Sequence, residues 1–129
     1  MYCMLKRLFA AATLTLLAGC DSPSAIDDYS LIHAEARAAT LSVSNVGARP
    51  VHYAVYERVD AGTVTWSRCT PANAGCPTLE PGATVRIPYA EIALYDDGDT
   101  EAIVYWWESQ ADGSGAYTVG RTGSIIVRL

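Results

Sequence analysis

The sequence predicts an all-β fold, an antiparallel β-sandwich of about seven short strands over residues 31–129. Three observations support this prediction. From position 40 onward apolar and polar residues alternate with a period of two, turn residues recur about every 8–12 positions, and no convincing long helix interrupts them. A chain of 129 residues with one such region has room for a single domain with one core.

The first clear strand surrounds Leu41 and Val43, which alternate with serines and are followed by turn residues at 45–47. Residues 29–39, which precede it, stay unassigned. Their second half, 35–39, has a helix-forming composition, whereas the first half fits an extended edge strand equally well.

Two further strands are predicted over residues 51–59 and 63–67. In the first of them the alternation is broken only by Glu57, which falls on the apolar side. In the other, Val64 and Trp66 are expected to be the buried residues.

The second half of the domain continues the pattern. A Pro-Gly pair at 81–82 predicts a tight turn before a strand over 84–89. Residues 102–107 are apolar on both faces, which indicates a central strand, and 117–129 alternates again. Two glycines in this last segment predict a β-bulge or a second hairpin: Gly120 and Gly123.

The N-terminus has the pattern of an export signal. Lys6 and Arg7 precede an apolar run over residues 8–17, and the small residues Ala18 and Gly19 follow it. As a helix the run would be about 15 Å long, half of the ~30 Å that a bilayer core requires. It is therefore predicted to be a secretory signal and not a stable membrane span.

The four residues Leu17, Ala18, Gly19 and Cys20 resemble the lipobox of bacterial lipoproteins. The resemblance implies that residues 1–19 are a cleaved signal peptide. It also implies that Cys20 carries a diacylglycerol thioether and an N-acyl chain such as palmitate, which anchors a flexible tether over 20–30. A plain signal peptide, or a cytosolic protein with an apolar N-terminus, is the alternative.

The resemblance also bears on location within the bacterial cell envelope. By the sorting rule of enterobacteria-like lipoproteins, Asp21 directly after the lipidated residue favours the periplasmic face of the inner membrane. The outer membrane is the alternative location.

A second resemblance concerns the domain. The strand and turn over 41–47, together with the Leu-Glu-Pro-Gly turn at 79–82, resemble immunoglobulin-like modules of bacterial surface proteins. This implies an immunoglobulin-like sandwich. The chain departs from antibody-type domains because it lacks their inter-sheet cysteine pair with a central tryptophan.

Charge excludes some classes of partner. Removing residues 1–19 would leave fourteen acidic residues, seven arginines and no lysine. Because neutralising phosphates requires clustered cations, this composition argues against nucleic-acid binding. It also argues against a protein face that lies flat on anionic lipid.

Cys69 and Cys76 enclose a turn-rich hexapeptide. In an oxidising compartment they are expected to form a disulfide. A metal-binding pair or a redox couple is the alternative, but the chain lacks the C-x-x-C spacing and a further nearby histidine.

A tentative Ca²⁺ site consists of four carboxylates within six residues: Asp96, Asp97, Asp99 and Glu101. A solvated acidic turn is the alternative, since Asp and Gly are also favoured in turns for conformational reasons. No other metal and no cofactor is expected.

Trp106 and Trp107 are adjacent in a predicted strand, so their side chains point to opposite faces. We expect only one of them in the core, with the other exposed or covered. The outward residue, with Tyr56 beside it, is the tentative partner-binding surface. The alternative is a central strand that is buried on both faces.

Only His33 and His52 could act as bases near neutral pH, and no nucleophile motif accompanies them. The sequence therefore predicts a non-enzymatic, membrane-anchored module that binds an envelope protein or peptide. One alternative is an inhibitor of an envelope-directed enzyme, because residues 114–117 are similar to a Ser-Gly-x-x-Tyr element of lipoproteins that inhibit lysozyme. Another is a structural lipoprotein without a specific ligand.

Overall fold

The structure is a computed structural model and describes residues 30–129. The predicted signal peptide, the predicted lipidation site Cys20 and the sorting residue Asp21 lie outside the described residues. Among those that are described, no helix is long and apolar enough to cross a membrane.

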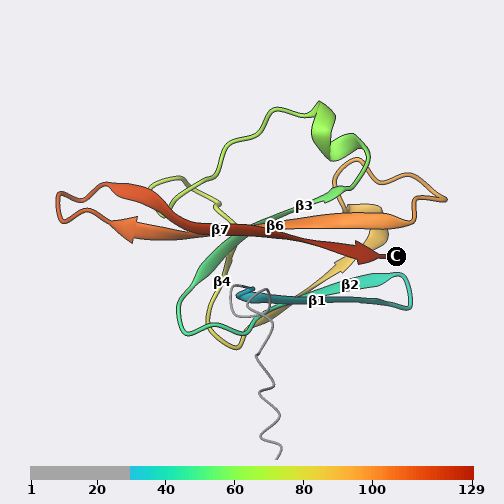
Figure 1. Cartoon of the computed structure of the whole chain (residues 1–129), viewed down its shortest axis with the longest axis horizontal. Helices are drawn as coiled ribbons and strands as arrows, with labels where there is room; N and C mark the ends of the chain where they lie inside the picture. Colours follow the sequence, from blue (N-terminus) through green and yellow to red (C-terminus); the bar gives the residue numbers. More distant parts are fainter. Residues whose placement is uncertain (1–29) are drawn as a thin grey trace, which may run out of the picture.

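The strands form two antiparallel sheets that stack face to face (Figure 1). The first sheet has the order β1-β2-β5, with β1 at Ile32–Arg37, β2 at Thr40–Asn45 and β5 at Thr84–Pro88. The second has the order β4-β3-β6-β7, with β4 at Thr78–Leu79, β3 at Val51–Glu57, β6 at Glu101–Ala111 and β7 at Tyr117–Arg128. Two 3-10 helices lie in the connections, η2 at Asp60–Thr63 and η3 at Tyr89–Glu91.

The prediction of an all-β antiparallel sandwich with seven strands is confirmed. Strands β1, β2 and β5 face strands β3, β6 and β7, which is the immunoglobulin-like arrangement. The short β4 pairs with β3 and so belongs to the second sheet. In the constant-type immunoglobulin domain, the fourth strand lies in the other sheet.

The core lies between the two sheets and follows from the period of two. In β2 every second residue is buried, and in β6 Ala102, Val104 and Trp106 point inward from alternate positions. Their burial against the facing sheet supplies the main hydrophobic stabilisation of the fold. The buried core residues are Ile32, Leu41, Val43, Val51, Leu79, Ile92, Ala102, Val104, Trp106 and Val127.

The unassigned segment before position 40 is strand β1, which pairs along its whole length with β2. The two strands are joined by Ala38 and Ala39, which have φ angles of 51° and 59°. Two-residue hairpin turns with positive φ at both positions usually contain Asn or Gly. Because alanine is an unusual residue for this turn, the local sequence carried no signal for the hairpin.

The predicted strand over 63–67 is wrong. Thr63 ends η2, and residues 64–67 run as an irregular segment across the outer face of the second sheet. Trp66 is half-buried against that face and is not in the inter-sheet core. Residues 58–77, which we name the crossing segment, therefore form a cover for the sheet.

Strand β4 has only two residues and was not predicted. It pairs with Val51 and His52 at the start of β3 and goes no further. The residue before β4 is Pro77, which has no N–H to donate to a ladder. Within the described residues, the edge of β3 beyond His52 consequently has no neighbouring strand until the isolated bridge between Tyr56 and Ala93.

The last predicted segment is one continuous strand, β7, and the expected bulge is confirmed within it. The β6–β7 register shifts between Trp107 and Ser109, so Gly120 and Arg121 together lie opposite the single residue Glu108. Beyond this bulge, the β6–β7 hairpin extends past the rest of the sandwich as an exposed arm (Figure 1). Residues 112–116 form the tip of the arm.

Candidate functional site

Four aromatic side chains gather on the outer face of the second sheet. Tyr56 comes from β3, Tyr105 and Trp107 come from β6, and Trp66 from the crossing segment lies against all three. The ring centroid of Trp66 is 4.9 Å from that of Tyr105, 5.5 Å from that of Trp107 and 5.9 Å from that of Tyr56. We name these four residues the aromatic cluster.

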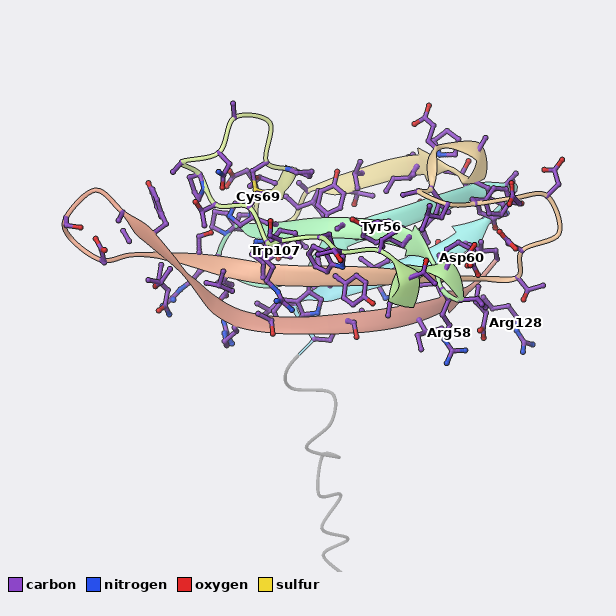
Figure 2. All side chains as sticks on the ribbon, turned by 90° about the horizontal axis from the view of Figure 1, so that it is seen from above. Tyr56, Arg58, Asp60, Cys69, Trp107 and Arg128 are labelled. Carbon is purple, nitrogen blue, oxygen red and sulfur yellow. A yellow bond between two sulfur atoms is a disulfide. The ribbon has the colours of Figure 1, made fainter. Side chains whose placement is uncertain are left out.

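The crossing segment covers Trp107 completely. Its indole N–H donates a hydrogen bond of 2.7 Å to the carbonyl oxygen of Cys69, and the residue is only 1 % exposed. Figure 2 looks onto this face and shows the positions of Tyr56, Trp107 and Cys69. Only Trp106 belongs to the inter-sheet core, as expected, and of the two outcomes expected for the outward tryptophan the covered one is observed, so both residues are buried.

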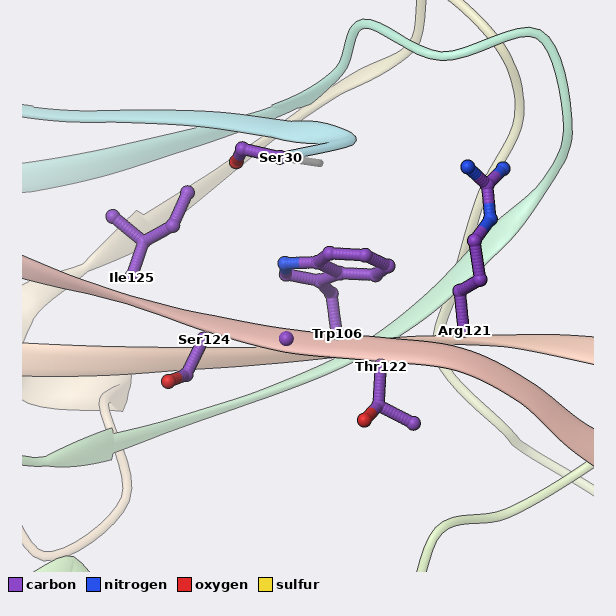
Figure 3. Close-up of a pocket in the computed structure, with 7 residues that line it drawn as sticks. Ser30, Trp106, Arg121, Thr122, Ser124 and Ile125 are labelled. Atoms are coloured by element: carbon purple, nitrogen blue, oxygen red, sulfur yellow. The ribbon is translucent and has the colours of Figure 1, made fainter. Parts of the chain in front are cut away.

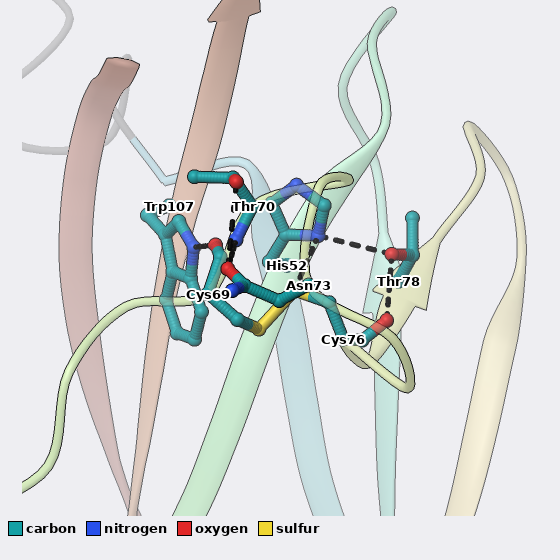
Figure 4. The surroundings of a disulfide bond; sticks show 7 residues. All are labelled: His52, Cys69, Thr70, Asn73, Cys76, Thr78 and Trp107. Atoms are coloured by element: carbon teal, nitrogen blue, oxygen red, sulfur yellow. Dashed lines mark hydrogen bonds between the residues drawn. A yellow bond between two sulfur atoms is a disulfide. The ribbon is translucent and has the colours of Figure 1, made fainter. Parts of the chain in front are cut away.

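The predicted disulfide between Cys69 and Cys76 is confirmed (Figure 4). Within its loop, Asn73 accepts a hydrogen bond from the Thr70 N–H through its side-chain oxygen. Behind the loop, His52 lies with Nδ1 2.9 Å from the hydroxyl oxygen of Thr78 and 3.4 Å from the sulfur of Cys76. The disulfide thus fixes the cover over Trp107 and His52.

Removing the disulfide should destabilise both the domain and this cover. For so short a loop, the chain-entropy model assigns about 2.5 kcal/mol to the cross-link. We expect a Cys69→Ser, Cys76→Ser double variant to lose about that free energy of unfolding in urea. Its tryptophan emission should also shift to longer wavelength as Trp107 becomes hydrated. Identical urea midpoints for the variant and the oxidised parent would contradict this prediction.

A pocket of about 370 Å³ opens beside the aromatic cluster. Tyr56, Trp66 and Trp107 line it, together with Ile87 and Glu91 from the neighbouring sheet and connection. It therefore brings together two of the three predicted binding residues, Tyr56 and Trp107. The contributions from Ile87 and Glu91 depend on how the sheets stack, and no local sequence pattern indicates them.

Residues 53–56 of β3, which lie along the open edge of this strand, contribute to the lining of this pocket. The edge is paired with β4 only as far as His52, and it meets the chain again where the Glu57 N–H donates to the Ala93 carbonyl at 2.8 Å. Main-chain groups two residues apart in a strand point to the same side. The N–H of Val55 consequently points to the same open edge, within the pocket lining.

Glu57 holds the start of the crossing segment, which explains a charged residue on the apolar side of β3. The residue is buried, and one carboxylate oxygen accepts a hydrogen bond of 2.7 Å from the Asp60 N–H. Hydrogen bonds from the backbone N–H groups of Val59 and Asp60 lower the pKa of Glu57 below its ordinary value. The ionised carboxylate thus fastens the turn that leads into the cover.

This lowered pKa predicts a pH dependence of stability. A carboxylate whose pKa is lower in the folded state than in the unfolded state stabilises the fold. This stabilisation is fully present at pH values above the unfolded-state pKa. It is lost as the pH falls through the folded-state pKa. Glu57→Gln should therefore be less stable than the parent at neutral pH. The difference should shrink below about pH 4. Urea titrations across that range measure it, and a difference that stays constant with pH would contradict the assignment.

Trp106 lies on the other side of β6, in the inter-sheet core, and is separated from the aromatic cluster by the sheet itself. Its indole packs over Gly123 of β7, where an added Cβ would lie only 2.6 Å from the ring. A second cavity of about 450 Å³ opens next to it, lined in part by Ser30, Arg121 and Ile125 (Figure 3). The three predicted binding residues therefore do not form one surface.

Two of the four carboxylates of the tentative Ca²⁺ site, those of Asp99 and Glu101, make local contacts. Asp99 accepts a hydrogen bond of 2.7 Å from the Asp96 N–H and closes the turn, and Glu101 pairs with Arg58 at 2.6 Å. Asp97 belongs to the same turn. Within residues 30–129, no group of three or more His, Cys, Asp or Glu side chains is placed to hold a metal ion. Calcium binding at this turn stays a prediction.

Comparisons with known protein families, with curated proteins and with solved structures found no match for this chain. The function is therefore inferred from the residues and their geometry.

Proposed function

We propose that this chain is a lipid-anchored, non-enzymatic lipoprotein of the bacterial envelope whose aromatic pocket binds an extended segment of another envelope protein. The lipobox-like residues 17–20 support the anchor. A flexible tether of about ten residues would have a root-mean-square reach of roughly 17 Å. The pocket would then meet its partners close to the membrane.

The observation that carries the binding role is the aromatic pocket beside an unpaired stretch of strand edge. Open strand edges accept an added strand through main-chain hydrogen bonds, and adjacent pockets select its side chains. Here the N–H of Val55 lies at the edge, between the pairing with β4 and the isolated bridge of Tyr56 with Ala93. The half-buried Trp66 and Tyr56 offer an apolar wall, which suits an aliphatic or aromatic side chain of the partner.

The binding role is tested by selecting peptides that bind the full chain from a displayed random library and measuring the affinity of the selected peptides. We expect the selected peptides to share an apolar anchor residue. We expect Trp66→Ala to lower the affinity of the chain for these peptides by about tenfold or more. Val46→Ala is the matched control, because Val46 is exposed and does not line the pocket. Failure to select any peptide, or equal weakening by both variants, would refute the proposal.

The anchor is tested separately by labelling with radioactive palmitate. The parent chain should incorporate the label at Cys20 and sediment with membranes, whereas Cys20→Ser should be unlabelled and released. A Cys20→Ser product that is processed and still sediments with membranes would refute acylation as the anchor.

One observation favours the inhibitor alternative as a second candidate. Residues 114–117 lie at the exposed end of the β6–β7 arm, where they could enter the cleft of an enzyme (Figure 1). Ser114 is held in place by Asp112, whose carboxylate accepts hydrogen bonds from its N–H and its hydroxyl. A lysozyme activity assay with the purified chain decides this candidate, since undiminished activity at excess protein discards it.

A further inference from the structure

His52 lies against one sulfur of the disulfide. In the chain it stands 24 positions before Cys76, so the sequence gives no sign that the two residues meet. Strand β3 places its Nδ1 3.4 Å from the Cys76 sulfur and 2.9 Å from the Thr78 hydroxyl oxygen (Figure 4). The residue is 3 % exposed, and its ring also packs against Trp107. A buried histidine is therefore held beside Cys76.

The hydrogen bonds of Thr78 indicate that Nδ1 of His52 is a donor. The Thr78 hydroxyl donates to the Cys76 carbonyl oxygen at 3.1 Å, and a hydroxyl has only one hydrogen to donate. The hydrogen between Thr78 and His52 is consequently on Nδ1. The same N–H is within hydrogen-bond distance of the Cys76 sulfur. It would stabilise a thiolate there, because hydrogen bonds to an ionised acceptor are the stronger ones.

The two sulfurs of the disulfide differ in this respect. Among the hydrogen bonds of residues 30–129, the sulfur of Cys76 has His52 as a donor and the sulfur of Cys69 has none. When a thiolate attacks a disulfide, the sulfur that forms the more stable thiolate leaves more readily. Attack at Cys69 is therefore favoured. Both cysteines are only half-buried, and residues 71–75 between them are exposed, so the disulfide lies at the molecular surface.

We propose that Cys69 and Cys76 form a thiol–disulfide exchange site for a dithiol reductant, in which His52 decides which sulfur leaves. One thiolate of the reductant attacks the Cys69 sulfur. A bond forms between these two sulfurs while the bond between Cys69 and Cys76 breaks, and the electron pair of the broken bond stays on Cys76.

The second thiolate of the reductant completes the exchange. It attacks the reductant sulfur that is bound to Cys69, which closes a disulfide within the reductant and releases the Cys69 thiolate. Two electrons thus pass from the dithiol to the protein disulfide. The two protons that the dithiol loses are taken up by the two cysteine thiolates.

Reduction would act on the cover of the second sheet. The Cys69 carbonyl holds the Trp107 N–H, and the disulfide ties this part of the crossing segment to Cys76, just before β4. Breaking the disulfide would loosen the cover over Trp107. The inference does not rest on the peptide-binding role of the aromatic pocket, because it depends only on the contacts around the disulfide.

The test uses glutathione, a monothiol, as the probe on the full chain in detergent. At early times it forms a single mixed disulfide per chain, and iodoacetamide then blocks the cysteine that left. Fragment mass spectrometry assigns the glutathione and the block to Cys69 or Cys76. We expect glutathione on Cys69 and the block on Cys76, in preference to the reverse by about threefold or more.

His52→Phe is the diagnostic variant, because it keeps an aromatic ring beside Trp107 and removes the N–H donor. We expect it to abolish the preference. His52→Asn restores a side-chain N–H donor and should recover the preference for glutathione on Cys69. His33→Phe is the matched control and should behave as the parent does, since His33 is exposed on β1 in the other sheet.

The parent chain in concentrated urea is the control for local sequence. It should show no preference, because unfolding separates His52 from Cys76. The inference is overturned if the folded parent modifies both cysteines equally, if the preference persists in urea, or if His52→Phe retains it. The comparison of folded and unfolded parent decides the matter even if a His52 variant does not fold. Peptide selection measures the aromatic pocket separately, so failure of one proposal is distinguishable from failure of the other.

Discussion

Trp107→Ala is expected to lower the free energy of unfolding by about 3–5 kcal/mol, the usual range for truncating a large buried aromatic residue. Trp107 is fully buried under the crossing segment, and its indole N–H is hydrogen bonded to Cys69. The substitution removes its contacts with Trp66 and His52 and leaves the Cys69 carbonyl without that donor. Urea unfolding followed by circular dichroism measures the loss.

Trp106→Ala should cause a loss of similar size from the opposite face of the same strand, since Trp106 is 4 % exposed and belongs to the inter-sheet core. Trp66→Ala is the contrasting variant. Because Trp66 is only half-buried, its replacement should cost less stability than either of the others. If Trp107→Ala were as stable as the parent, the crossing segment would not be a fixed cover and Trp107 would be accessible to a partner.

Gly123→Ala is expected to destabilise the domain by about 1–3 kcal/mol, the usual cost of overpacking a core. Gly123 lies directly opposite Trp106 in the β6–β7 ladder, and an added Cβ would lie 2.6 Å from two carbons of the indole. The large ring of Trp106 cannot move away, because it is packed within the core. Thermal or urea unfolding measures the effect.

Gly62→Ala is the matched control for this prediction. Gly62 lies in η2, where nothing is within 4 Å of an added Cβ, so we expect little or no loss of stability. A Gly123→Ala, Trp106→Phe double variant should recover part of the loss, because a smaller ring makes room for the methyl group. Additive losses in the double variant would show that the clash is not the cause.

The strands of the core were predictable because their signal is local. The alternation around Leu41 and Val43, and again around Val104, records directly which face of each strand is buried. The disulfide was predictable for the same kind of reason, since seven positions separate Cys69 from Cys76 and a turn-rich loop joins them. The bulge in β7 was indicated by Gly120.

Other features had no local signal. The hairpin of β1 and β2 uses two alanines at positive φ, so its turn is not readable from composition. Trp66 sits in an alternating pattern that resembles a strand, yet η2 and the disulfide loop leave its segment lying across the sheet. Strand β4 has only two residues, which is too short for an alternating pattern to show. Pro77 ends the pairing of β4 with β3 because proline has no N–H to donate, and this matters only because β3 lies beside it.

The sequence by itself determined that the domain is a β-sandwich with a local disulfide, and it supplied the prediction of export and lipidation at Cys20. These features depend on residues close together in the chain. Only the tertiary structure decided that Trp107 is covered, that Tyr56 lines a pocket with Trp66, and that His52 lies against the sulfur of Cys76. The reason is physical: the cover, the pockets and the open edge of β3 arise where segments distant in sequence pack together, and alternation within one strand does not specify what packs on its outer face.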